Sequence, residues 1–286
     1  MSERPRPPCA RPWLLCLLLL AGCQPQGGEG PGGRRQTLAL NPEQELRLGE
    51  QAYAEVLKKN RTVKGADLER VRRVGERIAE ASRIKGLRKE MRLHLDDRYL
   101  KWEYAVIDND KVINAFCLPG GKVAVYTGLL RLADSDDELA TVMGHEAGHA
   151  LAHHSSERIA EHQMRERAIE AANGALGRMD ESKRKLLIGV LGAGMELRGL
   201  SYSRNQESEA DHIGLFLMTF AKYDPDQTVT FWRKMERATG GSGRPELLSD
   251  HPGNLKRIAQ LQEWVPRAKG AYKAYKEGRV IPNLER

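Results

Sequence analysis

The sequence has little cysteine, no internal repeat and no apolar run long enough to cross a bilayer as a mature helix. The missing repeat excludes a solenoid, and the stretch after Pro252 is too short for an appended array of helical repeats. The N-terminal apolar run at residues 13–20 is too short to span a membrane comfortably. A multi-spanning membrane protein is therefore not expected.

That run is instead typical of a cleaved signal peptide at residues 1–22, because arginines precede it at positions 4, 6 and 11. The segment closes with Leu20-Ala21-Gly22-Cys23, which resembles the lipobox of bacterial lipoproteins. The resemblance implies cleavage before Cys23 and acylation of that residue, and an ordinary signal peptide is the alternative. Because residue 24 is not an aspartate, which would favour inner-membrane retention, we expect an outer-membrane lipoprotein that faces the periplasm and contacts lipid through Cys23.

Processing of this kind leaves Cys117 as the one free thiol, because Cys9 and Cys16 leave with the signal peptide. An intramolecular disulfide is then excluded, so stability must come from packing and from metal binding. The net charge of +7 falls by two when three arginines and one glutamate are removed. Such an excess, spread over many lysines and arginines, indicates solvated surface and no nucleic-acid partner.

Residues 23–37 are rich in Gly, Pro, Gln and Arg, which predicts a flexible tether in front of one folded domain at residues 38–286. Helical patterns begin at Asn41-Pro42 and return at residues 71–81. Alternation at 102–106, followed by runs at 112–118 and 123–126, predicts a small antiparallel sheet. Helices dominate from Gly128 onward, so the fold class is α+β and mostly helical. The sequence leaves open whether residues 173–199 form a lid, a plug or a membrane contact.

The chemistry centres on His145-Glu146-Ala147-Gly148-His149, in a helix that Ser135-Asp136-Asp137-Glu138 opens as a capping box. Four residues rise about 6 Å and complete a little more than one helical turn, so both histidines can hold one ion from the same face. Glu146 lies beside the ion, where its carboxylate can take a proton from metal-bound water and pass it to a leaving amine. We expect one catalytic zinc ion, which takes three such ligands and keeps a fourth position open.

Glu207 is expected to be the third ligand, in the segment Glu207-Ser208-Glu209-Ala210-Asp211 at the head of an apolar helix. Asp211 lies one turn later and is expected to accept a hydrogen bond from the outer nitrogen of a ligand histidine. Glu209 is interpreted as a solvated residue favoured by the helix dipole. His153 and His154 are expected to support the site or cap the helix, because His153 is about 12 Å along the axis from His145.

These segments and residues 114–121 resemble the HtpX and CAAX-endopeptidase type of gluzincin metallopeptidase, and within it the periplasmic lipoprotein branch that includes BepA and LoiP. The similarity covers roughly residues 38–258 in matching order. It implies a zincin-like fold with the small sheet beside the active-site helix, and endoproteolysis of damaged or stalled envelope proteins. The chain lacks the spanning helices of the HtpX branch and the repeat domain of BepA. Cys117 stands where alanine is usual, and we expect it to be a buried small apolar residue.

The resemblance also implies a role for His251, which matches a histidine that lies over the zinc in relatives. It would act as a fourth ligand or an oxyanion stabiliser, whereas a loop cap before Pro252 is the alternative. A substrate peptide is expected to extend along Asn114, Ala115 and Phe116, because exposed strand edges are templates for backbone pairing.

The expected function is therefore that of a zinc-dependent endopeptidase in envelope quality control, with unfolded or misassembled envelope proteins as substrates. One rival is a chaperone or assembly factor for outer-membrane proteins that cuts rarely, and another is a structural metalloprotein with a closed site. Glu146 favours catalysis over both, because a structural site has no use for that carboxylate. The sequence does not specify the substrate, the cleavage preference or the oligomeric state.

Overall fold

The computed structural model describes residues 26–176, 202–238, 247–248, 251 and 255–281. The expected signal peptide, Cys23 and residues 177–199 lie outside these ranges. The elements, in chain order, are β1 (Gln26–Glu29), η1 (Pro31–Gly33), β2 (Arg35–Leu38), α1 (Pro42–Lys59), β3 (Thr62–Val63), α2 (Ala66–Ala81), α3 (Lys85–Glu90), η2 (Asp97–Tyr99), β4 (Glu103–Ile107), β5 (Ala115–Leu118), β6 (Lys122–Tyr126), α4 (Thr127–Leu132), α5 (Asp136–Leu151), α6 (His154–Leu176), α8 (Arg204–Phe220), α9 (Asp226–Arg237) and α11 (Leu255–Lys276). This order confirms a mostly helical α+β fold.

The helices begin where local chemistry favours it. At the start of α1, the Asn41 side chain accepts from the Gln44 N–H at 2.9 Å, and Gln44 Oε1 accepts from the Asn41 N–H at 3.0 Å. At α5, Ser135 Oγ accepts from the Glu138 N–H at 3.1 Å, but the Glu138 carboxylate accepts from the Asp134 N–H and not from Ser135. The predicted capping box at α5 is therefore half formed.

The four-stranded sheet is mixed, which corrects the prediction that all its strands are antiparallel. Its order is β3-β4-β6-β5, with β4 and β6 parallel and the other two pairs antiparallel. The turn at residues 119–121 folds β6 back on β5, and its two glycines have φ of 79° and 84°, which favour glycine. Because β6 inserts between β4 and β5, β5 is left at the edge of the sheet.

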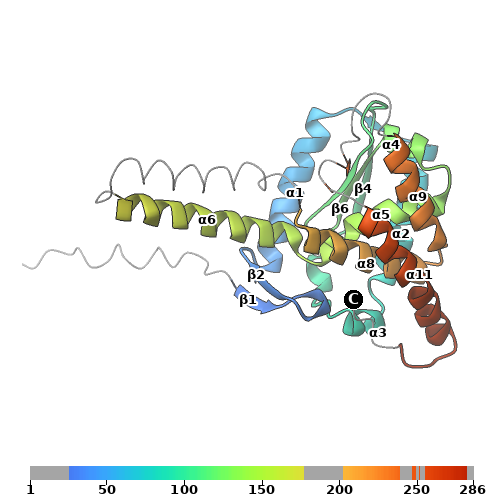
Figure 1. Cartoon of the computed structure of the whole chain (residues 1–286). Coiled ribbons are helices and arrows are strands. Elements are labelled where there is room, and N and C mark those ends of the chain that lie inside the picture. Colours follow the sequence, from blue (N-terminus) through green and yellow to red (C-terminus); the bar gives the residue numbers. More distant parts are fainter. Residues whose placement is uncertain (1–25, 177–201, 239–246, 249–250, 252–254, 282–286) are drawn as a thin grey trace, which may run out of the picture.

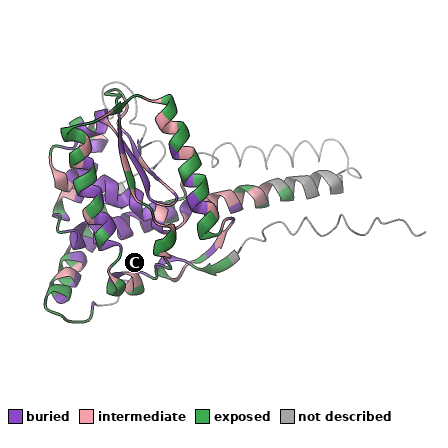
Figure 2. Cartoon of the chain, turned by 180° about the vertical axis from the view of Figure 1, so that it is seen from behind, coloured by how far each residue is buried: buried purple, intermediate pink, exposed green. Residues whose placement is uncertain are grey.

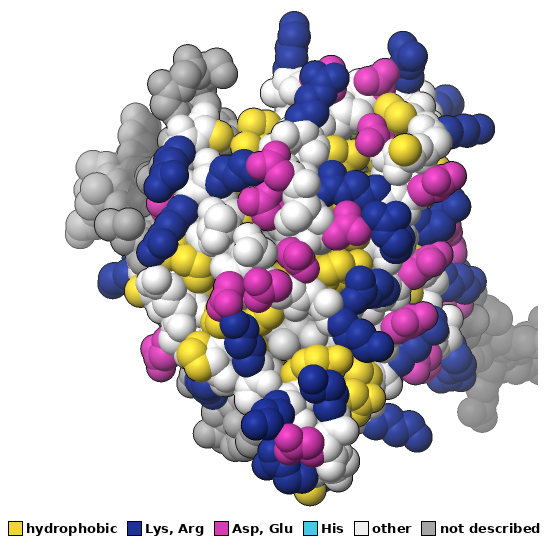
Figure 3. Space-filling view, turned by 90° about the vertical axis from the view of Figure 1, so that its right-hand side faces the viewer, with side chains coloured by type: hydrophobic (Ala, Val, Ile, Leu, Met, Phe, Trp, Pro, Cys, Tyr) yellow, Lys and Arg dark blue, Asp and Glu magenta, His cyan; other side chains and the backbone are white. Residues whose placement is uncertain are grey.

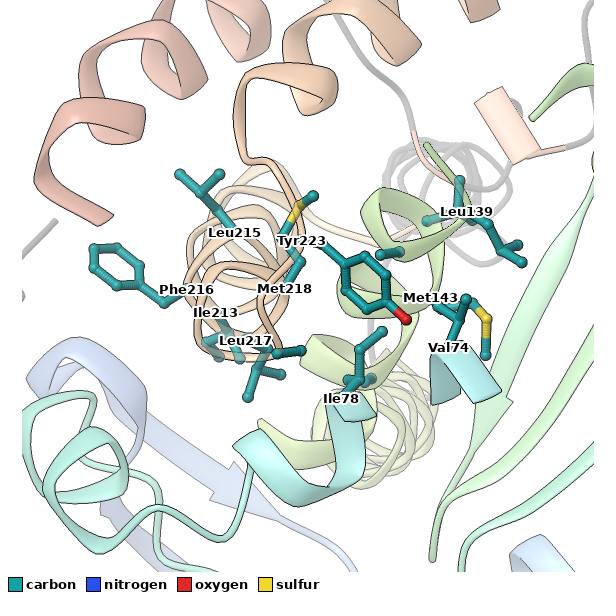
Figure 4. Close-up of a cluster of buried hydrophobic side chains, with 14 of the residues drawn as sticks. Val74, Ile78, Leu139, Met143, Ile213, Leu215, Phe216, Leu217, Met218 and Tyr223 are labelled. Atoms are coloured by element: carbon teal, nitrogen blue, oxygen red, sulfur yellow. The ribbon is translucent and has the colours of Figure 1, made fainter. Parts of the chain in front are cut away.

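The core lies between the sheet and the helices, with α5 at its centre (Figure 2). Thirteen of the sixteen residues of α5 are buried, because the helix packs against α2, α8, α9 and β5 at once. Figure 4 shows buried side chains of α2, α5 and α8, among them Val74 and Met143, which lie on the side of α8 that faces α2 and α5, and Phe216, which lies on the opposite side of α8. The helix that carries the expected chemistry is thus held rigidly on several sides.

Residues 26–38 form an antiparallel hairpin of β1 and β2 rather than a flexible tether, so order begins well before residue 38. Gly-rich composition offers little apolar area, yet polar contacts hold the hairpin to the start of α6 (Figure 1). Gln36 is buried and its amide donates to the Ala152 carbonyl at 2.6 Å, while the Ala39 N–H donates to the Ser156 carbonyl at 3.3 Å. Backbone and side-chain hydrogen bonds replace apolar burial here.

Helix α6 extends away from the body of the molecule (Figure 1), and its last turn includes residues 173–176 of the segment whose role was left open. Among the described residues, none of the helices combines the length and the apolar character that membrane crossing requires. On the face shown in Figure 3, Lys and Arg side chains lie among Asp and Glu side chains rather than in one basic patch. That mixture fits a solvated surface.

Candidate metal centre

The close crossing of α5 and α8 brings the expected ligands together. A Cβ on Gly144 would lie 2.8 Å from the Gly214 carbonyl oxygen, and one on Gly148 would lie 2.7 Å from the Ala210 carbonyl oxygen. A Cβ on Gly214 would lie 2.6 Å from the His145 nitrogen. The two backbones therefore touch only because glycine stands at these three positions. Side chains that leave the two helices beside this contact converge on one point.

Three expected ligand side chains meet there. His145 Nε2 and His149 Nε2 lie 3.1 Å apart. Glu207 Oε1 is 3.3 Å from His149 Nε2, and Glu207 Oε2 is 3.5 Å from His145 Nε2. All three residues are buried, at 1–4% exposure.

His251 joins this group from a third segment. Its Nδ1 lies 2.9 Å from Glu207 Oε1 and 3.2 Å from His145 Nε2, and the four donor atoms all lie within 4.8 Å of one another. Its Nε2 lies 3.5 Å from Glu146 Oε1. The His251 N–H donates to the Leu247 carbonyl, and the Leu247 N–H donates to the Ile113 carbonyl next to β5. The loop that carries His251 is therefore tied to the sheet.

The residues present fit a single zinc ion. Bonds of about 2.0–2.1 Å in a tetrahedral array place neighbouring ligand atoms about 3.3–3.4 Å apart, which is close to the separations observed here. Among the described residues, Glu207 Oε2 is buried with no hydrogen-bond partner, and the Arg257 Nη1 atom lies 3.5 Å from it, so this oxygen keeps a lone pair for a metal ion. Two imidazoles and a carboxylate are also the donor set of many catalytic zinc sites.

The charge states favour ligation. Burial holds the pKa of His145 and of His149 well below the usual histidine value, so both rings are neutral and have a lone pair to donate. Burial raises the pKa of Glu207, but the neighbouring His149 and His251 outweigh burial and hold that pKa well below its usual range. The ligand carboxylate is therefore ionised.

Asp211 lies beside the outer nitrogen of His145. His145 Nδ1 and Asp211 Oδ1 are 2.9 Å apart, so the Nδ1–H donates to the carboxylate and Nε2 is left for the metal. Arg257 also donates to Asp211 Oδ1, at 2.5 Å, and its guanidinium lies 3.5 Å from the centre of the Trp232 ring. Burial raises the pKa of Asp211 to about 6 despite the positive charge of Arg257.

Glu209 is fully buried, which corrects its interpretation as a solvated helix residue. Its Oε2 lies 2.9 Å from His154 Nε2, and His154 Nδ1 lies 2.9 Å from His149 Nδ1. A neutral His154 that donates from Nε2 accepts at Nδ1, so His149 donates from Nδ1 and keeps Nε2 for the metal. His154 therefore supports the site, whereas His153 turns away and contacts Glu45 at 2.6 Å.

Sequence reasoning missed three residues around the centre. Tyr202 lies against His149, with ring centroids 3.8 Å apart and an interplanar angle of 31°, and it stacks on His251 with centroids 5.1 Å apart. Trp232 meets His145 edge-on at 5.6 Å, and Arg257 was described above. None belongs to a recognisable motif, and the only sequence signal was the position of Tyr202 one residue before the Ser203 cap of α8.

The expected substrate strand lies next to α5. Asn114 immediately precedes β5, in which Ala115 is buried and Phe116 is partly exposed. The Tyr126 N–H donates to the Asn114 carbonyl, so by strand alternation the backbone groups of Ala115 and Cys117 face the open edge of the sheet. The Ala115 N–H donates to Asn114 Oδ1 at 2.8 Å. Cys117 is buried in the core, and burial raises the pKa of its thiol.

Several known proteins are similar to this chain. Mitochondrial metalloendopeptidase OMA1 of Schizosaccharomyces pombe is 40% identical over 171 residues, which cover 59% of this chain and 48% of that protein. The beta-barrel assembly-enhancing protease of Escherichia coli K12 is 32% identical over 176 residues, covering 59% of this chain and 35% of that protein. Human mitochondrial metalloendopeptidase OMA1 is 30% identical over 175 residues, with 59% and 33% coverage. The chain thus spans about half the length of these relatives or less.

The expected resemblance to BepA agrees with the similarity to an assembly-enhancing protease, while the HtpX-type placement, the lipoprotein branch and LoiP stay predictions. The model of Peptidase family M48 matches residues 67–265, which is more than half of the chain and includes all four donor residues. The chain therefore belongs to peptidase family M48.

Proposed function

We propose that this chain is a zinc-dependent endopeptidase in which His145, His149 and Glu207 hold the metal. The convergence of these buried donors with the Glu146 carboxylate, in a member of a peptidase family, carries the proposal. A bound zinc ion would act as a Lewis acid that polarises the scissile carbonyl and lowers the pKa of water. The relatives named above are metalloendopeptidases and a protease, which supports the same class of reaction.

Glu146 is the proton carrier in this scheme. Its carboxylate is buried beside the donors and lies 3.5 Å from His251 Nε2. It would accept the proton of the attacking water and deliver it to the leaving amine. Because Asp211 and His154 each accept a hydrogen bond from the outer nitrogen of a ligand histidine, both rings are fixed in one orientation before substrate arrives.

The substrate backbone would extend along β5 beside Asn114, Ala115 and Phe116, and would pair with the backbone groups of Ala115 and Cys117 that face the open edge. β5 ends the sheet and packs against α5, so an added strand would run past the metal centre. The Ala115 N–H donates to Asn114 Oδ1. A substrate carbonyl that pairs at this position would take the place of the Asn114 side chain. Only an unfolded segment can extend along the strand in this way. This requirement favours misfolded proteins as the substrates.

We place this activity at the outer membrane facing the periplasm, with lipid attached at Cys23 and misassembled envelope proteins as substrates. The Leu20-Ala21-Gly22-Cys23 segment supports the proposed location and lipid attachment. The name of the Escherichia coli relative agrees with a role in assembly. The OMA1 relatives are mitochondrial by name, so the compartment rests on the N-terminal segment alone. An assembly factor with restrained proteolysis is the second candidate, because His251 lies at the fourth position of the site.

The test is Glu146→Gln, which keeps the shape of the side chain but cannot take the proton. We expect zinc content near one per chain and loss of cleavage of unfolded casein, whereas Glu55→Gln on the exposed face of α1 should keep both. Undiminished cleavage by the Glu146 variant would rule out the assigned role. Loss of zinc from the Glu146 variant would instead mean that Glu146 is a ligand.

A further inference from the structure

A buried chain of polar contacts leads from His149 to the N-terminal hairpin. His154 and Glu209 form its first two steps, as described for the metal centre. The third step is Arg34, which lies between η1 and β2. Arg34 is far from His154 and Glu209 in the sequence. Arg34 Nη2 donates to Glu209 Oε2 at 2.9 Å, and Arg34 Nε donates to the same oxygen at 3.3 Å.

Arg34 also pairs with Glu157 of α6. Its Nη2 donates to Glu157 Oε2 at 2.8 Å, and its Nη1 contacts Glu157 Oε1. The guanidinium thus links two buried carboxylates, at 0% and 5% exposure, from two different helices. An arginine can do this because its donors form a planar fork, whereas a lysine is a single point charge. Without this cation, two negative charges would be buried near each other, and less favourable interaction would offset the cost of removing them from water.

We propose that Arg34, on the N-terminal hairpin, positions the metal-ligating imidazole of His149 through Glu209 and His154. This inference rests on the proposed zinc site. Arg34 fixes the Glu209 carboxylate, Glu209 fixes the His154 ring and its tautomer, and His154 accepts from His149 Nδ1. Gln36 secures the hairpin by donating to the Ala152 carbonyl, at the junction of α5 and α6. The hairpin is therefore a part of the metal centre.

The experiment measures zinc affinity by competition with a chelator of known affinity, in the full chain. Removal of an outer partner of a ligand histidine typically weakens metal binding roughly 10- to 100-fold. We expect that range for His154→Ala and Glu209→Ala, and about 10-fold for Arg34→Met, with part of the loss recovered in Arg34→Lys. Arg92→Met is the matched control, because Arg92 pairs with Glu29 on the same hairpin but is exposed.

A double-mutant cycle separates positioning from general stability. If Arg34 acts through Glu209, the combined Arg34→Met and Glu209→Ala variant should bind zinc no more weakly than Glu209→Ala alone. The absorption spectrum of the cobalt-substituted protein should also change in Arg34→Met, since it reports ligand geometry. Additive losses, or wild-type affinity in Arg34→Met together with a lower melting temperature of the zinc-free protein, would overturn the proposal.

His149→Ala distinguishes the two levels of inference. Loss of tight zinc binding in this variant is expected from the proposed site. If His149→Ala loses zinc while Arg34→Met keeps wild-type affinity, the proposed function stands and the role of Arg34 fails. If His149→Ala keeps zinc, the metal site itself is wrong.

Discussion

His251 is the residue that determines whether the fourth position beside the ligands is open. Its Nδ1 lies as close to Glu207 and His145 as the ligands lie to each other, so it would exclude the water that Glu146 needs. We expect His251→Ala to raise basal cleavage of unfolded casein several-fold, at unchanged zinc content. Steady-state proteolysis and zinc analysis check this, with His162→Ala on the exposed face of α6 as the control.

The opposite outcome is equally informative. Lower cleavage with zinc retained would mean that His251 stabilises the oxyanion after moving aside. Wild-type values for both would leave His251 as a loop residue without a part in the reaction.

Most site residues that the sequence predicted are those that helical periodicity relates, whereas His251 was expected from the family resemblance. His145, Glu146 and His149 share one helix, and Glu207 and Asp211 share another, so spacing alone fixes their relative directions. Periodicity does not reveal what another helix places opposite a residue. Glu209 was misjudged for that reason, because the partners that bury it, His154 and Arg34, come from other segments.

At the scale of elements, the contact between α5 and α8 is the most demanding feature. We expect Gly214→Ala to lower the free energy of unfolding by about 1–3 kcal/mol and to weaken zinc binding, because the added Cβ meets the backbone of α5. Thermal unfolding of the zinc-free and zinc-bound protein measures both effects.

Gly270→Ala is the matched control for that variant. A Cβ at Gly270, within α11, meets nothing within 4 Å, so alanine should leave stability unchanged or raise it by about 0.5–1 kcal/mol. Equal effects of the two substitutions would contradict the role of the close crossing.

The elements themselves were easier to predict than their arrangement. Caps and apolar spacing located α1, α2 and α5, and alternation located β4, β5 and β6. The order of the strands depends on the path that residues 108–114 take from β4 to β5, because this path leaves room for β6 between them. No local pattern in residues 108–114 indicates that path. The N-terminal hairpin was missed because Gly-rich composition hid a structure held by hydrogen bonds.

At the scale of the whole molecule, the proposed lipid at Cys23 would lie only three residues before the hairpin that begins at Gln26. We expect Cys23→Ser to abolish lipid labelling and to release a still active enzyme from the membrane fraction. Fractionation after metabolic labelling with a fatty acid checks this. Retention of the variant on membranes after a salt wash would assign anchoring to the 173–199 segment instead.

The four donors of the centre come from three parts of the chain, roughly 60 and 40 residues apart, and that spread affects the lifetime of the protein. A ligand that binds the folded state alone stabilises it in proportion to the logarithm of its free concentration. Cys117 is a free cysteine, and no disulfide joins the described residues. Within this part of the chain, therefore, no disulfide adds to the stabilisation that the metal gives. When zinc is scarce, the same molecules that lose activity would also unfold and be degraded sooner. The abundance of the enzyme would thus follow the zinc supply of its compartment without a dedicated regulator.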